Sequence, residues 1–408
     1  MNILHVVPTF YPCLAAGGVV NAVYELSKKQ AQHGHNVVVF TTDSCDKRIR
    51  LKKRYDVDID GVKTYYFRNL SNSLKSSFLI DTPYSFPFKL RKEIKKYDII
   101  HIHEHRHSLA IATSYYAHKF NIPYVLQAHG SVLPFFQKEK LKEIFDKLWG
   151  FKILHNAKKV LALTEVEKQQ YLKMRVKEEN IEIVPLGINL EEYDKNNLPK
   201  KGIFRKKYNI KDDEKLLLFL GRLNKIKGLG LLIKSFSILN DDFKTSENIK
   251  DSENIKASKN IKLAIVGPDN GFLKELKTLI EKYDLKKNVI ITGPLYENNK
   301  KEALLDCDIF IMPSKYESFT TSGLEAMACG KPLVLTENNH ISDWVDSVTG
   351  FTSEYDEIKL ATSIKSLITD EKLMNEFGKN GKNLIKERYN WDSIESQIKT
   401  IYENILKK

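Results

Sequence analysis

The most informative part of the chain is Ser314-Lys-Tyr-Glu-Ser-Phe-Thr-Thr-Ser-Gly-Leu-Glu-Ala-Met-Ala-Cys-Gly-Lys-Pro332, in which a loop leads from a buried strand into a short helix. It carries two carboxylates, Glu317 and Glu325. Earlier in the chain, Phe219-Leu-Gly-Arg-Leu-Asn-Lys-Ile-Lys-Gly228 ends another buried strand with Arg222 and Lys227 beside glycines. Carboxylates accept hydrogen bonds from vicinal hydroxyl groups, and an arginine with a lysine suits a diphosphate. The two stretches together indicate a site for a nucleotide joined to a sugar.

Each of these residues also has a simpler interpretation. Glu325 fits a capping box with Ser322 at the helix start, and Glu317 fits a solvated loop carboxylate. Arg222 and Lys227 fit ordinary surface cations. Their positions favour binding, because both stretches follow strands, and ligands of α/β sheets bind outside the carboxyl ends of the strands.

Short apolar runs alternate with amphipathic stretches along the whole chain. The runs are continuously apolar, which is typical of parallel strands buried on both faces. The predicted strands are Ile3–Val7, Val37–Thr42, Val62–Phe67, Ile99–His103, Tyr124–Ala128, Val160–Thr164 and Ile181–Val184, followed by Leu216–Leu220, Leu263–Val266, Val289–Thr292, Ile309–Met312 and Leu333–Thr336. Two βα arrays in series predict an α/β protein of two doubly wound domains.

The segment Pro185–Asn189 separates the two arrays. It predicts a first domain over residues 1–189 and a second over 190–390. The amphipathic helix expected over 391–408 has no strand of its own to cover, so we expect it to cross back to the first domain. Polar repeats of the type Ser-Glu-Asn-Ile-Lys are too few and too polar to bury a core, and they predict a flexible insert over 241–260.

Composition narrows the class of protein. The length of 408 residues suits two cores, and no apolar run reaches the roughly 18 residues of a membrane-spanning helix. The N-terminal residues are typical of a strand rather than of a signal peptide. The four cysteines lack metal-binding spacing, which predicts reduced thiols and a cytoplasmic protein. The formal net charge of +13 indicates an anionic partner, whether nucleotide, nucleic acid or membrane.

The first domain offers further candidates. Gly17 and Gly18 open the helix predicted over Val19–His33, where they fit either a tight turn or amides that contact a phosphate. No Gly-x-Gly-x-x-Gly is present, which argues against a simple dinucleotide site. His103 and His129 both stand where a predicted strand ends. A metal site is not expected, because the chain has no His-Glu-x-x-His helix pair.

Two basic stretches rich in aromatic residues, Phe86–Lys96 and Phe135–Lys152, have two interpretations. Packing on the sheet through Leu141, Ile144, Phe145 and Leu148 accounts for most of the second stretch. Peripheral contact with the inner face of the cell membrane is the other hypothesis. No helix-turn-helix, RNP-type or zinc signature supports a nucleic-acid partner.

These motifs resemble those of the family-4 retaining glycosyltransferases, the group 1 glycosyl transferases. The resemblance rests on Glu317-x7-Glu325, on Glu325-Ala-Met-Ala-Cys-Gly-Lys-Pro332 and on Gly221-Arg-Leu-x-x-x-Lys-Gly228, and it extends over essentially the whole chain. It implies the B-type glycosyltransferase fold, in which two Rossmann-like domains face a cleft and a final helix returns to the first. The family often has Glu-Gly-Phe-Gly where this chain has Glu317-Ser-Phe-Thr320, and the added hydroxyls bear on which donor sugar is bound.

The resemblance also implies residue roles. Arg222 and Lys227 would hold the diphosphate, Glu325 the ribose hydroxyls and Glu317 the donor hexose, with His129 near the transferred sugar. The other candidate contacts to nucleotide or substrate are Gly17, Gly18, His103, Gly293, Pro294, Leu295, Ser318, Phe319, Thr320 and Thr321.

The leading hypothesis is a metal-independent transfer of a hexose from a nucleotide-diphosphate sugar to an acceptor hydroxyl, with retention and without a cofactor. The expected acceptor is a sugar, a glycolipid or a lipid-linked sugar in cell-surface polysaccharide or glycolipid biosynthesis. The alternatives are a nucleotide-sugar epimerase of the same fold, a non-catalytic nucleotide-sugar binding protein and a basic nucleic-acid binder.

Overall fold

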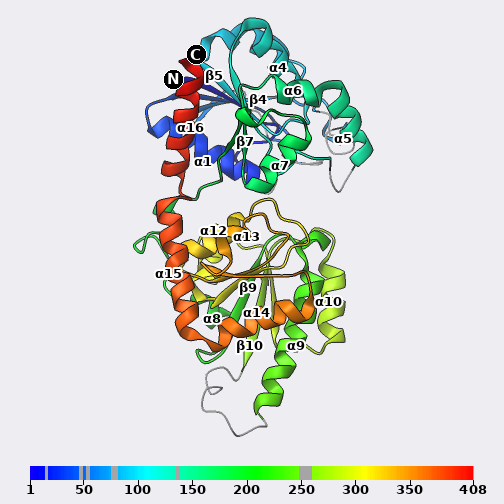
Figure 1. Ribbon diagram of the computed structural model, residues 1–408, viewed down its shortest axis with the longest axis vertical. Helices are drawn as coiled ribbons and strands as arrows, with labels where there is room; N and C mark the ends of the chain where they lie inside the picture. Colours follow the sequence, from blue (N-terminus) through cyan, green and yellow to red (C-terminus); the bar gives the residue numbers. More distant parts are fainter. Residues whose placement is uncertain are drawn as a thin grey trace. The chain divides into compact units, whose positions relative to one another are not determined.

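The computed structural model describes residues 1–13, 17–45, 49–51, 56–74, 81–134, 138–247 and 260–407, which form two compact units (Figure 1). Unit 1 comprises Met1–Gly187 and Trp391–Lys408, and unit 2 comprises Ile188–Asn390. Most of the repeat within 241–260 lies outside the described residues. Residues 241–247 do not belong to a flexible insert, because they continue the helix Leu229–Glu247.

Unit 1 is built on an eight-stranded sheet in the order β3-β4-β2-β1-β5-β6-β7-β8. Neighbouring strands are parallel except β3 and β4, which are antiparallel. The strands are β1 (Asn2–Val6), β2 (Asn36–Thr42), β3 (Val57–Ile59), β4 (Val62–Phe67), β5 (Ile99–His103), β6 (Tyr124–Gln127), β7 (Lys159–Ala162) and β8 (Ile181–Ile183). The α-helices are α1 (Gly18–Gln32), α3 (Phe86–Glu93), α4 (Ser108–Phe120), α5 (Glu139–Phe145), α6 (Phe151–His155), α7 (Glu165–Lys173) and α16 (Trp391–Leu406).

The core of unit 1 lies on both faces of this sheet. On one face, strand residues such as Phe40, Ile100 and Ile102 pack with Phe86 and Leu90 of α3. On the other face, α1 covers a smaller cluster that includes Val23, Val37 and Val39. Because both faces of the strands are buried, their sequences are continuously apolar, as the sequence predicted.

The returning helix α16 packs against α1 in unit 1, which confirms the prediction for the last segment (Figure 1). Trp391, Ile394, Ile398 and Tyr402 recur at helical spacing and are all buried. Polar contacts anchor the same helix: Glu395 Oε2 lies 2.6 Å from His33 Nδ1, and Lys29 pairs with Asp392 at 3.0 Å. The helix α16 is therefore part of the fold of unit 1, together with residues 1–187.

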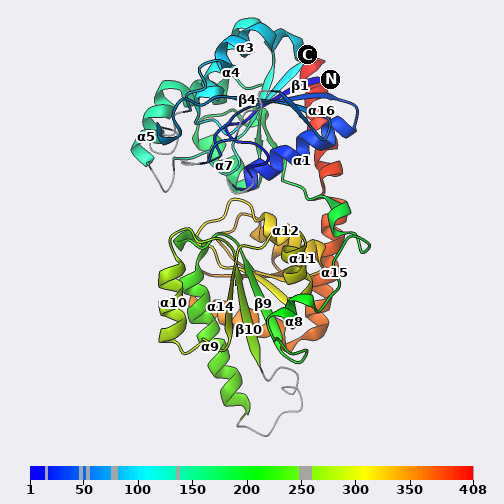
Figure 2. The same ribbon diagram turned by 180° about the vertical axis from the view of Figure 1, so that it is seen from behind.

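Unit 2 is a parallel six-stranded sheet in the order β11-β10-β9-β12-β13-β14. Its strands are β9 (Lys215–Leu220), β10 (Ile261–Val266), β11 (Val289–Gly293), β12 (Ile309–Met312), β13 (Leu333–Thr336) and β14 (Gly350–Ser353). Its α-helices are α8 (Ile203–Lys207), α9 (Leu229–Glu247), α10 (Leu273–Lys282), α11 (Glu297–Asp306), α12 (Thr321–Ala328), α13 (Ser342–Val345), α14 (Glu357–Thr369) and α15 (Glu371–Glu387). Helices α9, α10 and α14 cover one face of the sheet, and α8, α11 and α12 lie on the other (Figures 1 and 2).

Both sheets have the doubly wound order that was predicted. In unit 1 the strand order reverses between β1 and β5, and in unit 2 it reverses between β9 and β12. Loops that leave the carboxyl ends of two such strands diverge to opposite faces and leave room for a ligand. The reversal between β9 and β12 therefore places the two sequence stretches that carry Arg222 and Glu317 next to each other.

Two cysteines differ from the prediction of reduced thiols. Cys13 and Cys45 form a disulfide, with their Cα atoms 5.2 Å apart. They follow β1 and β2, which are parallel neighbours, so the loops after these strands meet at one edge of the sheet. Cys307 and Cys329 are free thiols, as predicted, and both are buried.

Candidate functional site

The loops after β9 and β12 are packed together backbone to backbone. The Lys315 amide donates to the Ile226 carbonyl at 2.7 Å. Gly228 has φ +70°, and a Cβ at this position would stand 1.7 Å from the carbonyl oxygen of Pro313. Only glycine allows this approach, so Gly228 fixes the loop of Arg222 and Lys227 against the loop of Glu317.

Lys227 and Glu317, predicted to bind different parts of one ligand, form an ion pair in this structure. Their side chains are 17% and 13% exposed, so the pair is only partly accessible to water. The Ser314 hydroxyl also lies 3.5 Å from Glu317 Oε2. Arg222, at the start of the same loop, is exposed. The cation and the carboxylate thus neutralise each other where the loops meet.

The Glu317 loop is held by the segment that follows β13. The Glu317 amide donates to the Asn338 carbonyl at 3.1 Å, and the His340 amide donates to the Glu317 carbonyl at 2.9 Å. Asn339 Nδ2 donates to Thr320 Oγ1 at 2.5 Å. The hydroxyl of Thr320, which stands where the family often has glycine, is therefore buried and already hydrogen-bonded.

Helix α12 begins at Thr321 rather than at Ser322, and Thr320 at its N-cap makes no side-chain capping bond. Ser318 is half-buried and Phe319 is buried. The first turn of α12 follows directly on these residues. Ser318, Phe319, Thr320 and Thr321 thus lie together at the carboxyl edge of the unit 2 sheet.

Glu325 does not form a capping box, because its carboxylate is engaged by a lysine of another helix. Lys300 Nζ on α11 lies 2.6 Å from Glu325 Oε1. Burial works against the charge of Lys300, but the neighbouring Glu325 carboxylate raises the pKa of this lysine. Burial, with Glu325 nearby, also raises the pKa of Tyr193. Sequence reasoning missed Lys300 and Tyr193, because neither lies in a motif.

The remaining unit 2 candidates lie after β11. Gly293 ends that strand with φ +76°, and its carbonyl accepts from the Gly267 amide at 3.0 Å. Pro294 is exposed and Leu295 is half-buried. Because β11 stands at the far side of β10 from β9, these residues lie along the same carboxyl edge as Arg222.

In unit 1, Gly17 and Gly18 lie at the start of α1, after β1. Gly17 is the N-cap residue with φ 125° and no side-chain cap, and Gly18 is the first helical residue. The two alanines before them lie outside the described residues. The amides of this first turn face the carboxyl edge of the sheet beside β5, where His103 ends its strand.

The structure groups His103 with histidines from neighbouring strands. His5 on β1 pairs in register with His101 on β5, and the ring nitrogens of His5, His101 and His103 can lie within 4.8 Å of one another. All three are fully buried. His5 Nδ1 and His103 Nε2 are 2.8 Å apart, and His103 Nδ1 lies 3.0 Å from His129 Nε2. His103 therefore stands behind His129, with both ring nitrogens engaged, and His5 was missed from the sequence.

His129 is held by its own backbone and by a buried carboxylate. Its φ is +52°, an uncommon value for a residue other than glycine. The next amide, of Gly130, donates to Glu167 Oε1 at 2.6 Å, and the Leu163 amide donates to Glu167 Oε2 at the same distance. Burial raises the pKa of Glu167 to about 7, against these two hydrogen bonds. Such backbone strain persists only where the surroundings impose it.

The buried histidines predict an acid-sensitive unit 1. Burial lowers the pKa of His5 to about 4 and that of His129 to about 3, below the value of 6.5 in an unfolded chain. The unfolded chain then binds more protons than the folded one, so the free energy of unfolding is lost as pH falls from 6.5 towards 4. Each such histidine contributes up to about 1.4 kcal/mol per pH unit.

Urea unfolding at pH 7, 6 and 5 measures this loss. His101→Gln removes one buried imidazole, whose pKa burial also lowers, and is expected to reduce the slope with pH. His118→Gln, at an exposed position, is the control and should leave the slope unchanged. An equal slope in His101→Gln and the parent protein would show that His101 does not contribute to the loss of stability at low pH.

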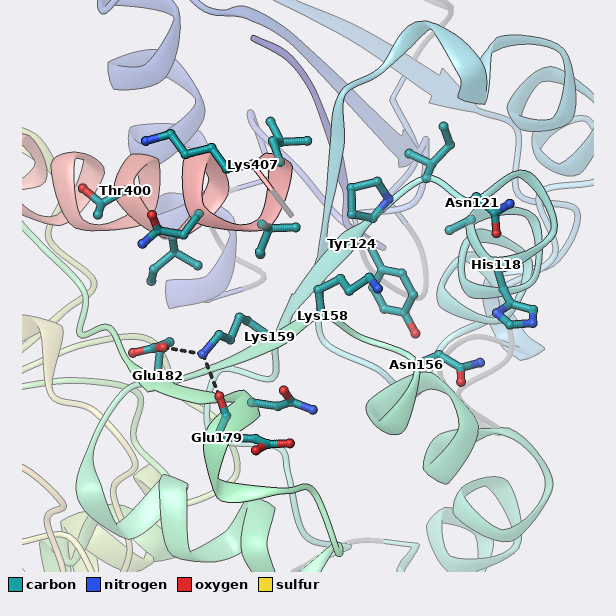
Figure 3. A pocket seen from close by; sticks show the side chains of 18 of the residues that line it. His118, Asn121, Tyr124, Asn156, Lys158, Lys159, Glu179, Glu182, Thr400 and Lys407 are labelled. Atoms are coloured by element: carbon teal, nitrogen blue, oxygen red, sulfur yellow. Dashed lines mark hydrogen bonds and ion pairs between the residues drawn. The ribbon is translucent and has the colours of Figure 1, made fainter.

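One groove of unit 1 lies away from these residues. A groove of about 1520 Å³ runs along the second half of α16 and past the amino ends of β6 and β7 (Figure 3). Its Lys159 forms an ion pair with Glu182 at 2.6 Å and donates a hydrogen bond to the Glu179 carbonyl at 2.7 Å. The groove is at the opposite end of the strands from His103 and His129, so it is not part of the candidate site.

Comparison with known proteins follows the same division of the chain. The family described as Glycosyltransferase Family 4 matches residues 16–192, and the family described as Glycosyl transferases group 1 matches residues 200–384. The chain belongs to the family-4 retaining glycosyltransferases, and it is an enzyme that transfers a sugar from a nucleotide-sugar donor.

Individual relatives cover nearly the whole chain. An uncharacterized glycosyltransferase of Methanocaldococcus jannaschii is 24% identical, over 96% of each chain. The alpha-monoglucosyldiacylglycerol synthase of Streptococcus pneumoniae is 23% identical, over 90% of this chain and 78% of its own. The crystal structure of Anabaena HepE in complex with UDP and glucose has a TM-score of 0.73 at 17% identity, over 99% of this chain and 100% of its own. This likeness shows the B-type glycosyltransferase fold.

Proposed function

We propose that the protein transfers a hexose from a nucleotide-diphosphate sugar to an acceptor hydroxyl with retention of configuration, in cell-surface polysaccharide or glycolipid biosynthesis. The observation that carries this proposal is the pairing of Lys227 with Glu317 and of Lys300 with Glu325 at one edge of unit 2. Two carboxylates for hydroxyl groups and cations for a diphosphate stand together there, beside the strand reversal.

Donor binding would exchange the partners of these charges. The diphosphate would take Lys227 and Arg222, and Glu317 would turn to the hexose hydroxyls. Glu325, supported by Lys300, would accept hydrogen bonds from the ribose. An arginine provides a planar fork for a phosphate, and a lysine provides a compact charge. Unit 2 is thus the proposed donor-binding unit, and unit 1, with Gly17, Gly18 and His129, the acceptor-side unit.

The chemical step would need little from the protein beyond charge and position. The bond between the sugar C1 and the diphosphate oxygen breaks, and its electron pair goes to that oxygen. Arg222 and Lys227 stabilise the developing negative charge. The acceptor hydroxyl forms the new bond on the face that the diphosphate leaves, and its proton goes to a phosphate oxygen. This route gives retention without an enzymatic nucleophile.

Two alternative functions make different products. An epimerase of the same fold forms an altered sugar from the donor without any acceptor, and a binding protein forms no product. The presence of both carboxylates and of Arg222 and Lys227 counts against a binding protein that has lost its catalytic residues. Product analysis with and without acceptor separates the three.

A thermal-shift series with UDP, GDP, ADP and their sugar conjugates tests the donor site. A ligand that binds only the folded chain stabilises it by about 2.7 kcal/mol at a hundredfold excess over Kd, and it therefore raises the melting temperature. One nucleotide is expected to stabilise the protein selectively, with or without EDTA. The absence of a shift with all three nucleotides would contradict the proposed donor site.

Unit 1 also carries an exposed apolar face that bears on the acceptor. Ile144, Leu148 and Trp149 are 55%, 57% and 42% exposed. The prediction that Ile144 and Leu148 pack on the sheet is therefore wrong, because α5 and the π-helical turn after it, Asp146–Gly150, direct them outward. Residues 135–137, at the start of this predicted stretch, lie outside the described residues. Among the described residues, none of the helices is long and apolar enough to cross a membrane.

This exposed face, residues 144, 148 and 149, supports contact with an anionic membrane. Lysines flank it at positions 140, 142, 147 and 152. Apolar side chains that enter the lipid interface, with lysines around them, are typical of proteins that lie on an anionic bilayer. A membrane glycolipid or lipid-linked sugar is therefore the acceptor class that we propose.

Replacing Ile144, Leu148 and Trp149 together by serine is expected to weaken vesicle binding at least tenfold. Each apolar side chain contributes about 1.5–3 kcal/mol when fully buried, and tenfold corresponds to about 1.4 kcal/mol. Sedimentation with vesicles of phosphatidylglycerol and phosphatidylcholine measures the change. Ile358→Ser, at a site 62% exposed in unit 2, is the control. Equal binding by the triple variant and the control would refute membrane contact at this face.

A further inference from the structure

The groove beside the second half of α16 is lined by an unusual number of side-chain amides. It has a volume of about 1520 Å³, and all of its lining residues belong to unit 1 (Figure 3). The residues that carry these amides are Asn121, Asn156, Asn180, Gln397 and Asn404. Because a side-chain amide both donates and accepts hydrogen bonds, this lining suits a ligand whose own groups do both.

Three of the amides come from neighbouring strands of the sheet. Asn121, Asn156 and Asn180 stand one to three residues before β6, β7 and β8, which pair in parallel. Since neighbouring strands lie about 4.8 Å apart, these asparagines form a row across the amino edge of the sheet. The facing wall is α16, on which Thr400 and Asn404 share one face. Figure 3 shows Thr400 across the groove from Asn121 and Asn156.

The asparagine side chains are available to a ligand. Asn121, Asn156 and Asn404 are exposed, and Asn180 is half-buried. Their side-chain amides make no hydrogen bond within the part of the chain that the structure describes. Asn121 does have a structural role, because its left-handed backbone ends α4. That role uses the backbone of Asn121 and leaves its side-chain amide free.

The charges of the groove favour a neutral ligand. Its lining holds three lysines and two glutamates, a formal charge of +1. Glu182 pairs with Lys159 at 2.6 Å, and Glu179 lies 3.6 Å from Lys177. A cleft that attracts an anion is lined by charges of one sign. The paired and opposite charges of this groove do not select an anion.

The shape and the apolar part of the lining narrow the ligand further. Tyr124 is buried, and its hydroxyl donates to the Ile153 carbonyl at 2.6 Å, so its ring is not open for stacking with a base. Ile122 and Ile405 are half-buried beside the amides. A sugar ring matches such a surface, because it has hydroxyl groups at its edge and C–H groups on its faces. The volume exceeds the roughly 300–1,000 Å³ of a small-molecule pocket, which leaves room for several joined rings.

We propose that this groove binds a neutral oligosaccharide of several sugar units. The sugar hydroxyls exchange hydrogen bonds with the amides of the two walls, and the C–H faces pack on Ile122 and Ile405. The groove lies at the amino edge of the unit 1 sheet, whereas Gly17 and His103 stand at the carboxyl edge. The part of a glycan that is bound here is therefore not the part that reacts. Binding requires no donor and does not depend on the proposed function.

The test is calorimetric titration of the whole chain, without nucleotide sugar, with linear hexasaccharides of glucose, of mannose and of N-acetylglucosamine. We expect one of the three to bind with a Kd of about 1 mM or below, and its monosaccharide to bind at least about tenfold more weakly. Because the ligand is neutral, the Kd should stay the same when NaCl is raised from about 0.05 to about 0.5 M.

Variants of both walls locate the binding. Asn156→Ala combined with Asn404→Ala removes one amide from each wall and is expected to raise the Kd about tenfold, through two lost hydrogen bonds. Thr400→Trp fills the groove and is expected to abolish binding. Asn375→Ala, at an exposed position on α15 in unit 2, is the matched control. All of these positions are exposed, so the melting temperatures should stay close to that of the parent.

Three results would overturn the inference. They are the absence of binding by all three hexasaccharides, equal binding by the groove variants and by Asn375→Ala, and binding that is lost at high salt. A dimer in sedimentation that Thr400→Trp dissociates would also do so, because a second copy would then occupy the groove. Failure of nucleotide-sugar turnover with intact hexasaccharide binding would instead remove the proposed function and leave the role of the groove.

Discussion

Arg222→Ala is expected to lower kcat for nucleotide-sugar turnover by about 10²- to 10³-fold, the loss typical of removing one group that stabilises charge in the transition state. The residue follows β9 at the strand reversal of unit 2, and its exposed side chain is available to a diphosphate. Release of the nucleoside diphosphate measures turnover. Because Arg222 is exposed, the melting temperature of the variant should stay close to that of the parent.

Lys225→Ala is the matched control for this change. Lys225 is an exposed cation in the same loop, within the 3₁₀ turn Lys225–Lys227. If Arg222 acts through its position and not only through net charge, Lys225→Ala keeps nearly full activity. Full activity of a folded Arg222→Ala would refute the role of Arg222, and equal losses in both variants would indicate a general effect of charge.

Gly228→Ala is expected to cost about 3 kcal/mol or more of folding free energy and to abolish donor binding. The added Cβ would stand 1.7 Å from the Pro313 carbonyl oxygen, with φ at +70°. Either the loop that carries Lys227 or the loop that carries Glu317 must therefore move. Urea unfolding and nucleoside diphosphate titration measure the two effects.

Gly202→Ala separates backbone strain from this collision. Gly202 has φ +95°, but a Cβ there meets no atom within 4 Å. The control variant should therefore lose only roughly 1–2 kcal/mol of folding free energy, which is the cost of the left-handed conformation for a residue other than glycine, and it should bind donor normally. Equal losses of stability in the two variants would show that the contact with Pro313 is not what requires glycine.

The sequence predicted both sheets because their strands are buried on both faces and so stand out as apolar runs. It missed β3 and β14, which are short edge strands with little apolar pattern: Val57-Asp-Ile59 and Gly350-Phe-Thr-Ser353. It also missed the Cys13–Cys45 disulfide, because the residues are 32 positions apart and meet only once β1 and β2 are paired.

In the candidate site, too, the contacts that depend on the folded structure were not predicted. Arg222, Lys227, Glu317 and Glu325 were recognisable because each stands in a motif after a strand. Lys300 was not, because it is one of the many lysines of the chain and the contact of its helix with α12 is known only from the fold. His5 offered one usable signal: its strand pairs with the strand of His101 and His103, and a sheet order with β1 beside β5 predicts their contact.

The anomeric configuration of the first product tests the central proposal most directly. The protein is incubated with the nucleotide sugar that stabilises it, with lipid-linked or glycolipid acceptor in vesicles, and proton NMR follows the anomeric signal before any mutarotation. The proposed mechanism predicts a new glycosidic bond with the configuration of the donor, formed only with acceptor and lost in Arg222→Ala. A product of inverted configuration, or an epimerised sugar formed without acceptor, would contradict it.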